Sequence, residues 1–439
     1  MKFMKLFFAL AWIALFGLSC KSKLKTVTRA EDYEAYLQLK TQSSLRTLKL
    51  INTDINFWSQ RLKNGVSFDP VCRVKLAGLY ASRFKVAGDI KDIHTSDSLY
   101  LLANPLIKIG SSSVYKAMAA NCITQHKFRQ AKLFIDTALK MGDDKYSSIL
   151  MQCDVSIELG DLALAKKSLD QIEDKNDFDY LTREAKLLDH QGHLAEAIIK
   201  MEKAAQQVKS SNNDKLFSWV ETNLGDMYGH DNRYTEAYHC YLEVLKKNPE
   251  DLYSLKGIAW LAFSHDKNVS AAKRILNYLS NVHPVPDYDL MLAKIADYEK
   301  NWSAKKKLLD KFLSEVSDPL YGDMYNKYVF YLSSDEIRNT TKALSIAERE
   351  VNNRPTAQSF DLLAWANFQA GHREEALKIE RSFVENKNFE PDAFYHMGII
   401  YATSGNAAQG KKYLSQARRA SFELGPVMAD QIQTALENL

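Results

Sequence analysis

The side chains best suited to metal or redox chemistry in this chain are its 5 cysteines and 10 histidines. The cysteines are Cys20, Cys72, Cys122, Cys153 and Cys240. No Cys-x-x-Cys pair occurs, so neither a zinc motif nor a dithiol redox motif is present. His190 and His193 flank Gly192 in a predicted turn, where solvated polar residues are typical. We therefore expect no metal site and no cofactor.

The four cysteines after Cys20 have two readings. Free cysteine often behaves as a small buried residue, and we expect this of all four. Export to an oxidising compartment would also permit a disulfide between Cys122 and Cys153, and the sequence leaves this alternative open.

Catalytic and nucleic-acid-binding signatures are missing from the sequence. It contains no Gly-x-Gly-x-x-Gly, no Walker loop, no His-Glu-x-x-His and no Gly-x-Ser-x-Gly. The formal net charge is +4, and removal of Lys2 and Lys5 with a leader would leave +2. Nucleic-acid binders depend on a strong basic excess, which this chain lacks. We expect a protein that is not an enzyme and does not bind nucleic acid.

The first 20 residues have the pattern of an export signal. Lys2 and Lys5 precede the apolar run from Leu6 to Leu18, which is short for a membrane span. The following Ser19-Cys20 resembles the lipobox of bacterial lipoproteins, although Gly17-Leu18 departs from the usual order. The resemblance implies a signal peptide at 1–19 and lipidation of Cys20 at the start of a linker, 20–28. A plain signal peptide followed by a chance cysteine is the alternative.

Low glycine and proline content favours long helices. The chain has 17 glycines and 9 prolines among 439 residues, about 6%, against about 12% in ordinary proteins. So few turn-forming residues do not suit many short strands. The 46% of hydrophobic residues is ample for a buried core. The composition therefore predicts an all-α protein.

Small residues recur at a spacing close to 34 residues within predicted helices. One series is Ala131, Ala165, Ala197, Ala237, Ala271, Ala304, Ala343, Ala376 and Gly410. A second series lies about twelve residues earlier: Ala119, Cys153, Ala185, Gly225, Ala259, Ala293, Ala364 and Gly398. Two helices joined by a tight turn can approach closely only where the side chains at the crossing are small. The spacing predicts stacked helical hairpins, because one hairpin cannot bury its apolar face alone.

This pattern resembles the tetratricopeptide repeat, most clearly from Val220 to Pro249. There Leu224-Gly225, Tyr228, Ala237 and Tyr241 stand at the signature spacing of that family. The resemblance implies a right-handed superhelical solenoid of antiparallel helical hairpins. We predict about nine repeats over 112–424, preceded by a helical N-terminal cap with an atypical repeat over 29–111. A C-terminal capping helix is expected over 425–439.

In that family the inner helices line a concave groove that commonly holds a peptide. The corresponding positions here are Trp219, Asp226, Trp260, Tyr325, Tyr328, Trp365, Phe368 and Tyr395. In the N-terminal half these positions are mostly charged: Lys116, Ile123, Asp154, Asp179, Lys186 and Asp189. An exposed aromatic stripe marks an interaction site. The alternative is that these side chains pack between neighbouring repeats and never contact a partner.

The resemblances together imply a membrane-anchored scaffold or adaptor at the bacterial cell envelope, which binds a partner protein or peptide in its groove. Lys21 after the lipobox favours the outer membrane, with the solenoid facing the periplasm or the cell surface. The second hypothesis is a glycan- or nutrient-binding lipoprotein, because aromatic residues also stack on sugar rings. The regular repeats and short predicted loops favour the scaffold.

Overall fold

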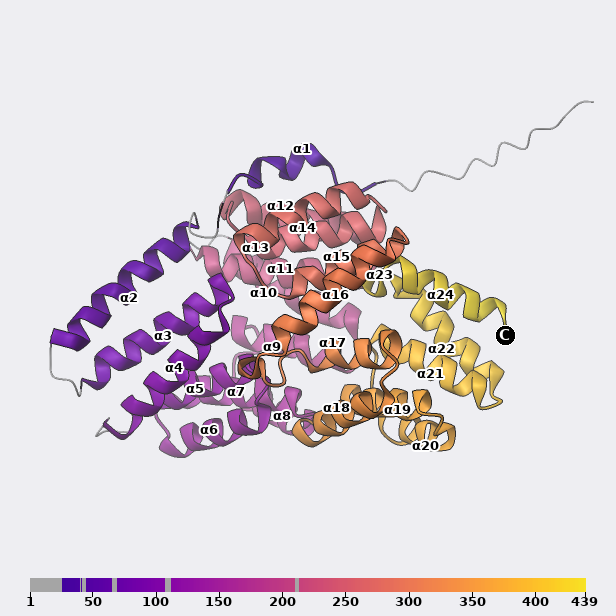
Figure 1. Ribbon diagram of the computed structural model, residues 1–439. Coiled ribbons are helices and arrows are strands. Elements are labelled where there is room, and N and C mark those ends of the chain that lie inside the picture. The colour runs from indigo at the N-terminus through magenta and orange to yellow at the C-terminus, as the bar shows by residue number, and fades with distance from the viewer. Residues whose placement is uncertain (1–25, 40, 42–44, 65–68, 107–111, 210–212) are drawn as a thin grey trace, which may run out of the picture.

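The computed structural model describes residues 26–439 except 40, 42–44, 65–68, 107–111 and 210–212 (Figure 1). These residues form helices, with no β-strand among them. The signal peptide predicted at 1–19 and Cys20 lie outside the described residues.

Ten pairs of consecutive helices make up most of the described chain. They are α3 (Pro70–Ala87) with α4 (Ile90–Ala103), α5 (Ser112–Thr124) with α6 (Phe128–Met141), α7 (Lys145–Glu158) with α8 (Leu162–Asp170), α9 (Phe178–His190) with α10 (Leu194–Lys209), α11 (Asp214–His230) with α12 (Tyr234–Lys247), α13 (Leu252–Trp260) with α14 (Val269–Val282), α15 (Asp287–Tyr298) with α16 (Trp302–Val316), α17 (Asn326–Tyr331) with α18 (Thr340–Asn353), α19 (Ala357–Gln369) with α20 (Arg373–Ile379), and α21 (Pro391–Thr403) with α22 (Ala407–Arg419). The predicted all-α solenoid of helical hairpins is confirmed.

Further elements connect these pairs or flank them. All but one are short: α1 (Ala30–Tyr33), α23 (Ser421–Leu424) and α24 (Pro426–Glu437), the 3₁₀ turns η1 (Glu34–Tyr36), η3 (Asn104–Leu106) and η5 (Pro319–Tyr321), and the π-helical segments η4 (Leu261–His265), η6 (Leu332–Glu336) and η7 (Glu380–Val384). The exception is α2 (Arg46–Asn64), with 19 residues. At the end of the chain α24 packs on α22, where Ile432 joins Leu414 and Ala417 in a buried cluster.

The recurring small residues lie where the two helices of a pair cross. Ala119 and Ala131 of the first predicted repeat are both fully buried. In the last pair, a Cβ atom on Gly398 would lie 2.6 Å from Leu414 Cγ, which is closer than two non-bonded carbon atoms can approach. The spacing of small residues in the sequence therefore reports the close contact between paired helices.

The π-helical segment η4 shifts this register by one residue in the middle of the chain. The sequence pattern placed Ala271 at a crossing, but Ala272 is the fully buried residue and Ala271 is only half-buried. A π-helical turn adds one residue to a helix, and η4 lies directly before this hairpin turn. Part of the polar segment 333–340 also belongs to a π-helical turn, since η6 includes the fully buried Ser333.

The solenoid closes on itself, because turns of its first half contact loops of its second half. The Phe389 ring packs on Gly192, where a Cβ atom would lie 2.6 Å from Phe389 Cδ1. Gly160 contacts Pro355 and Thr356 in the same way. We call this contact the closure seam; its members are 126–129, 158–160, Gly192 and Gly229 on one side, and 352–356, Phe389 and Phe422 on the other.

Arg354 is the main charged group of the closure seam. Its guanidinium lies 3.5 Å from Glu158 of α7 and 3.3 Å from Glu350 of α18. It also lies 5.3 Å from the centre of the Phe128 ring. Nearby, Asn353 Nδ2 donates to the His126 carbonyl oxygen over 2.8 Å. Arg354 thus connects two parts of the chain that are about 200 residues apart.

The first described residues do not lie at the N-terminal end of the solenoid. The sequence grouped 29–111 as one cap, and α2 does cover α3 at that end. Residues 26–37, which we call the arm, instead lie across α12 and α14 (Figure 1). The arm therefore departs from the predicted organisation, and its contacts are formed more than 200 residues away in sequence.

We expect Arg354→Ala to lower the free energy of unfolding by about 2 kcal/mol, because two carboxylates lose a charged hydrogen-bonding partner. The loss of stability stays moderate because Glu158 still has Lys186 as a hydrogen-bond partner and Glu350 still has Asn326. Loosening of the closure seam should also raise the radius of gyration in small-angle X-ray scattering. Lys378→Ala, in an exposed ion pair with Glu375, is the matched control and should change neither value. If Arg354→Ala unfolds with the same free energy as the wild-type protein, Arg354 does not stabilise the closure seam.

Candidate functional site: the inner face of the solenoid

First helices of neighbouring pairs lie side by side in several parts of the solenoid. Contacts join α5 to α7, α7 to α9, α11 to α13 and α19 to α21. We call the exposed side of the helices α7, α9, α11, α13, α15, α17, α19 and α21 the inner face. All eight predicted groove residues belong to these helices or to the residue directly before one of them.

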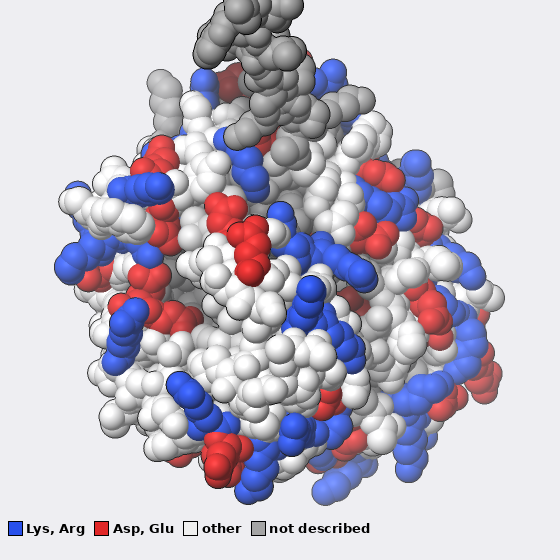
Figure 2. All heavy atoms as spheres, turned by 90° about the vertical axis from the view of Figure 1, so that its right-hand side faces the viewer, with Lys and Arg blue, Asp and Glu red and all other residues white. Residues whose placement is uncertain are grey.

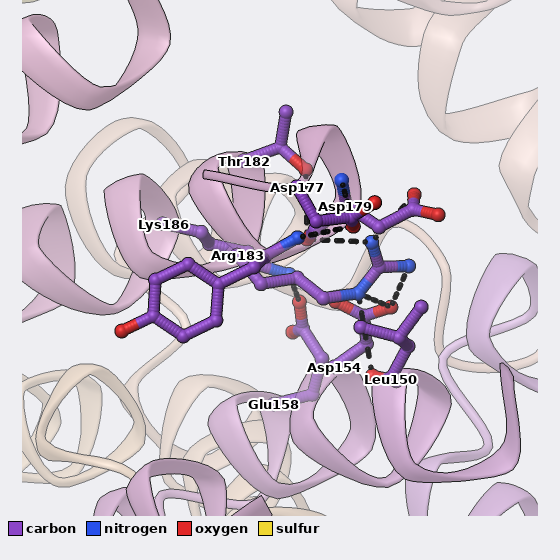
Figure 3. A network of polar contacts seen from close by, with 9 residues as sticks. Leu150, Asp154, Glu158, Asp177, Asp179, Thr182, Arg183 and Lys186 are labelled. Carbon is purple, nitrogen blue, oxygen red and sulfur yellow. Dashed lines mark hydrogen bonds and ion pairs between the residues drawn. The ribbon is translucent and has the colours of Figure 1, made fainter. Parts of the chain in front are cut away.

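The N-terminal half of the inner face is a network of paired charges (Figure 3). Arg183 of α9 lies 3.0 Å from Asp154 of α7 and 3.1 Å from Asp179. One turn further along α9, Lys186 Nζ donates to Glu158 over 2.9 Å. Burial alone would raise the pKa of Glu158, but Lys186 and Arg354 more than offset it and hold the pKa below its usual value. This half is already neutralised by its own residues.

Aromatic side chains become accessible in the middle of the inner face. Trp219 of α11 is 47% exposed and packs edge-on against Phe178. Tyr253 of α13 is 46% exposed and donates its hydroxyl to Asp226. Asp226 also accepts a hydrogen bond from Tyr241 over 2.6 Å, so the predicted groove residue Asp226 acts as a fixed acceptor between α12 and α13.

Trp260 is half-buried at the C-terminal end of α13. Its ring packs edge-on against Phe263, with the centroids 5.7 Å apart. Gly425, between α23 and α24, brings its backbone against the same indole. Lys294 of α15 lies over the ring, with Nζ 5.3 Å from its centre. Trp260 thus packs against the C-terminal segment, and one face of its ring lies next to the exposed Lys294.

Tyr325 and Tyr328 lie at the start of α17 and differ in exposure. The Tyr325 hydroxyl donates to Asp287 over 2.7 Å, and its ring packs against Phe312. Tyr328 is 44% exposed. Between them, Lys327 Nζ forms an ion pair of 2.9 Å with Asp392 of α21. Asp392 raises the pKa of Lys327 above its usual value, and this effect exceeds the lowering that burial causes.

Trp365, Phe368 and Tyr395 pack together between α19 and α21. Trp365 is only 4% exposed, stacks on Phe368 at 5.2 Å, and donates its indole N–H to Asp335 over 2.9 Å. Phe368 and Tyr395 are half-buried in the same cluster. For these three residues the structure favours the alternative left open by the sequence, which is packing between neighbouring repeats.

A buried ion pair supports that cluster. His396 stacks on Trp365 at 4.2 Å, and its Nδ1 lies 2.9 Å from Asp361. Burial lowers the pKa of His396, but Asp361 more than offsets this, so the pKa is raised above its usual value. Beneath the pair, Glu380 is fully buried with both carboxylate oxygens unpaired. Burial and the nearby Asp361 raise its pKa well above that of an ordinary glutamate.

Several inner-face residues were missed by the sequence reasoning. Tyr253, Lys256 and Trp260 share one helical face at spacings of three and seven residues, which could have identified Tyr253. No local pattern could have identified Asp392 as the partner of Lys327, because the two residues come from different hairpins.

A group of acidic side chains gathers where the C-terminal segment meets α11. Glu423 of α23 lies 3.6 Å from His230. Burial raises the pKa of Glu423 to about 7, and the carboxylates of Glu390, Asp392 and Asp189 add to this effect. The neutral form of Glu423 therefore suits this position better than the ionised form.

A cavity of about 830 Å³ lies away from the inner face, between the arm and α12. Its charged side chains already have partners within the protein. Arg29 pairs with Asp32, Arg233 with Glu236 and Lys246 with Glu243. The lining therefore does not define a ligand class.

The remaining candidates for chemistry are accounted for among the described residues. Cys72, Cys122, Cys153 and Cys240 are buried free thiols, so Cys122 and Cys153 form no disulfide. His193 pairs with Glu196 at 3.3 Å. Within the described chain, no group of three or more His, Cys, Asp or Glu side chains is placed to hold a metal ion. No helix of that part is long and apolar enough to span a membrane.

The surface charge is mixed. Figure 2 shows Lys and Arg interspersed with Asp and Glu on the face that includes the C-terminal helices, with uncharged surface between them. This mixture agrees with the formal net charge of +4. The face offers no continuous basic area of the kind that binds nucleic acid.

The chain is similar to solved helical proteins but matches no protein-family model and no curated protein. One similar structure is a tetratricopeptide repeat protein from Parabacteroides merdae, with 15% identity and a TM-score of 0.34 over 66% of this chain and 97% of that one. Others are yeast Tom70, with 13% identity and a TM-score of 0.34 over 93% and 96% of the two chains, and human IFIT1, with 13% identity and a TM-score of 0.42 over 91% and 96%. With such low values, none of these similarities carries an argument about function.

We expect the C-terminal segment to loosen as the pH rises through about 7, the pKa of Glu423. A raised pKa in the folded state means that the stability contributed by the neutral form is complete below the ordinary glutamate pKa and is lost as Glu423 ionises. Hydrogen exchange of α23 and α24, corrected for the intrinsic pH dependence, should therefore be faster at about pH 8.5 than at about pH 6.

Glu423→Gln should remove this pH dependence, because the amide stays neutral. Glu375→Gln, a change on the exposed side of α20, is the matched control and should retain it. Corrected exchange rates that do not change with pH in the wild-type protein would overturn the assignment.

Proposed function

We propose that this chain is a scaffold that binds an extended segment of a partner protein along the middle of its inner face. One observation carries the proposal. Trp219, Tyr253 and Tyr328 come from three first helices, and each exposes between 44% and 47% of its surface. Large aromatic side chains dominate the free energy of protein interfaces, and clustered exposure of them marks such sites.

The groups around these aromatics suit a peptide backbone. Asp226 and Asp287 are held as hydrogen-bond acceptors by tyrosine hydroxyls, and Lys256 lies 4.5 Å from the centre of the Tyr253 ring. Fixed acceptors and lysines beside aromatic rings can pair with the amide and carboxylate groups of an extended chain. The proposal assigns no catalytic step to the protein.

We further propose that the scaffold is attached to the outer membrane of a bacterial envelope through a lipid on Cys20. Support comes from the N-terminal pattern of two lysines, an apolar run and Ser19-Cys20. One acyl chain binds a bilayer only marginally, whereas several chains hold a protein there stably. The resemblance to lipoproteins implies the latter.

A photo-reactive residue in place of Trp219 or Tyr328 should crosslink one and the same protein in native cells. Trp302 of α16 is the matched control, because it is 61% exposed but belongs to a second helix. A crosslinker there should not capture that protein.

The captured segment, made as a purified peptide, should then bind the wild-type chain. Its affinity should fall about thirty-fold in Trp219→Ala and in Tyr328→Ala, the loss typical of an interface hot spot of about 2 kcal/mol. Equal capture of the same protein from position 302, or peptide binding that neither substitution weakens, would contradict the proposal. Specific binding to a glycan array in place of the peptide would favour the nutrient-binding alternative.

Cys20→Ala should move the full-length protein from the membrane fraction of cells to the soluble fraction. Cys72→Ala keeps the lipobox and removes a buried thiol, so it should stay in the membrane fraction and serves as the control. A Cys20→Ala protein that remains in the membrane fraction would contradict lipid attachment at this residue.

A further inference from the structure

The arm is fixed to the middle of the solenoid by a buried carboxylate. The Asp266 side chain is fully buried and accepts hydrogen bonds from the backbone N–H groups of Val27 and Thr28, both over 2.8 Å. The Thr28 hydroxyl donates to the same carboxylate over 2.6 Å, and His265 Nδ1 lies 2.8 Å from it. Four polar groups thus converge on one carboxylate, which leaves the start of the arm little freedom.

The rest of the arm continues along α12 and α14. Tyr238 of α12 accepts a hydrogen bond from the Arg29 N–H over 3.1 Å. Tyr33 is only 2% exposed and belongs to the largest hydrophobic cluster described. Glu34 forms an ion pair with Arg274 of α14. The arm therefore packs as part of the core and is not a loose tail.

The length of chain before the arm limits where a bilayer can lie. Thr26 is the first described residue, and Cys20 precedes it by six positions. Six residues span at most about 20 Å when fully extended. A lipid on Cys20 must consequently lie within about 20 Å of the point where the arm begins, on the side of α12 and α14.

We propose that the docked arm fixes the orientation of the solenoid on the membrane, with the side formed by α12 and α14 facing the lipid surface. The proposal rests on lipidation of Cys20 as proposed above. α18, α19 and α20 lie on the opposite side of the molecule from α1, α12 and α14 (Figure 1). They face away from the bilayer, and the inner face lies between the two sides, open to a partner in the aqueous compartment.

Energy transfer from the protein to a labelled bilayer tests this orientation. The lipidated full-length chain is reconstituted into phospholipid vesicles that carry an acceptor dye on the headgroups. A donor is attached to a cysteine introduced by His239→Cys on α12 or by Lys378→Cys on α20, two positions with 72% and 73% exposed side chains. The four described native thiols are buried, so the new cysteine reacts selectively.

We expect several-fold more transfer from position 239 than from position 378. Equal transfer from both positions, or more from 378, would overturn the proposal. Loss of transfer from both positions together with loss of the protein from the vesicles would instead overturn the lipid attachment, so the two failures are distinguishable.

Two variants test the cause of the orientation. Twelve glycine and serine residues inserted after Lys25 leave the arm docked but lengthen the tether to about 60 Å, which should remove the difference between the two positions. Asp266→Ala should reduce the same difference between the two positions, because it releases the arm. If Asp266→Ala does not fold, the insertion variant still tests the proposal, since it leaves the folded part of the protein unchanged. A difference that persists in the insertion variant would show that the short tether does not set the orientation.

Discussion

The closure seam is the contact on which the rest of this structure depends. Two of its contacts form where turns of the first half carry a glycine, which has no side chain. Gly192 leaves room for the Phe389 ring, and Gly160 leaves room for the backbone at Pro355. Both glycines also have the positive φ angles, 79° and 75°, that end their helices. A residue with a Cβ atom at Gly192 would therefore impose backbone strain and separate the two halves at once.

Closure places charges from distant hairpins in one shared space. Glu158 contacts Arg354 and Glu423 contacts His230, although the members of each pair lie about 200 residues apart in sequence. The ion pair of Arg354 with Glu158 stabilises the closed form. Burial, and to a smaller extent the neighbouring carboxylates, raise the pKa of Glu423 to about 7 where the C-terminal segment packs against α11. The same closure thus forms one stabilising ion pair and raises the pKa of one carboxyl group.

The repeated small residues made the hairpins predictable, because contact between paired helices is local and leaves a fixed spacing. The exposure of the inner-face aromatics was not predictable in the same way. Trp260 and Trp365 each directly follow the buried alanine of a first helix, yet Trp260 is half-buried beside Lys294 while His396 covers Trp365. That difference depends on which residue the next hairpin presents. The π-helical turn η4 also changed the register by one residue, and no composition or spacing rule marks such an insertion.

The arm couples the two ends of the chain to the same place. Asp266 binds its start, His265 next to Asp266 packs against Tyr234 at 4.3 Å, and Tyr234 packs against Phe422 at 4.8 Å. Ser264 also donates a hydrogen bond to the Phe422 carbonyl oxygen. The arm and the C-terminal segment therefore both contact η4 or the residue after it, and the rings of His265, Tyr234 and Phe422 connect the two contacts. Because interiors pack closely and yield little, a force on the arm acts first on the residues that hold the C-terminal segment in place.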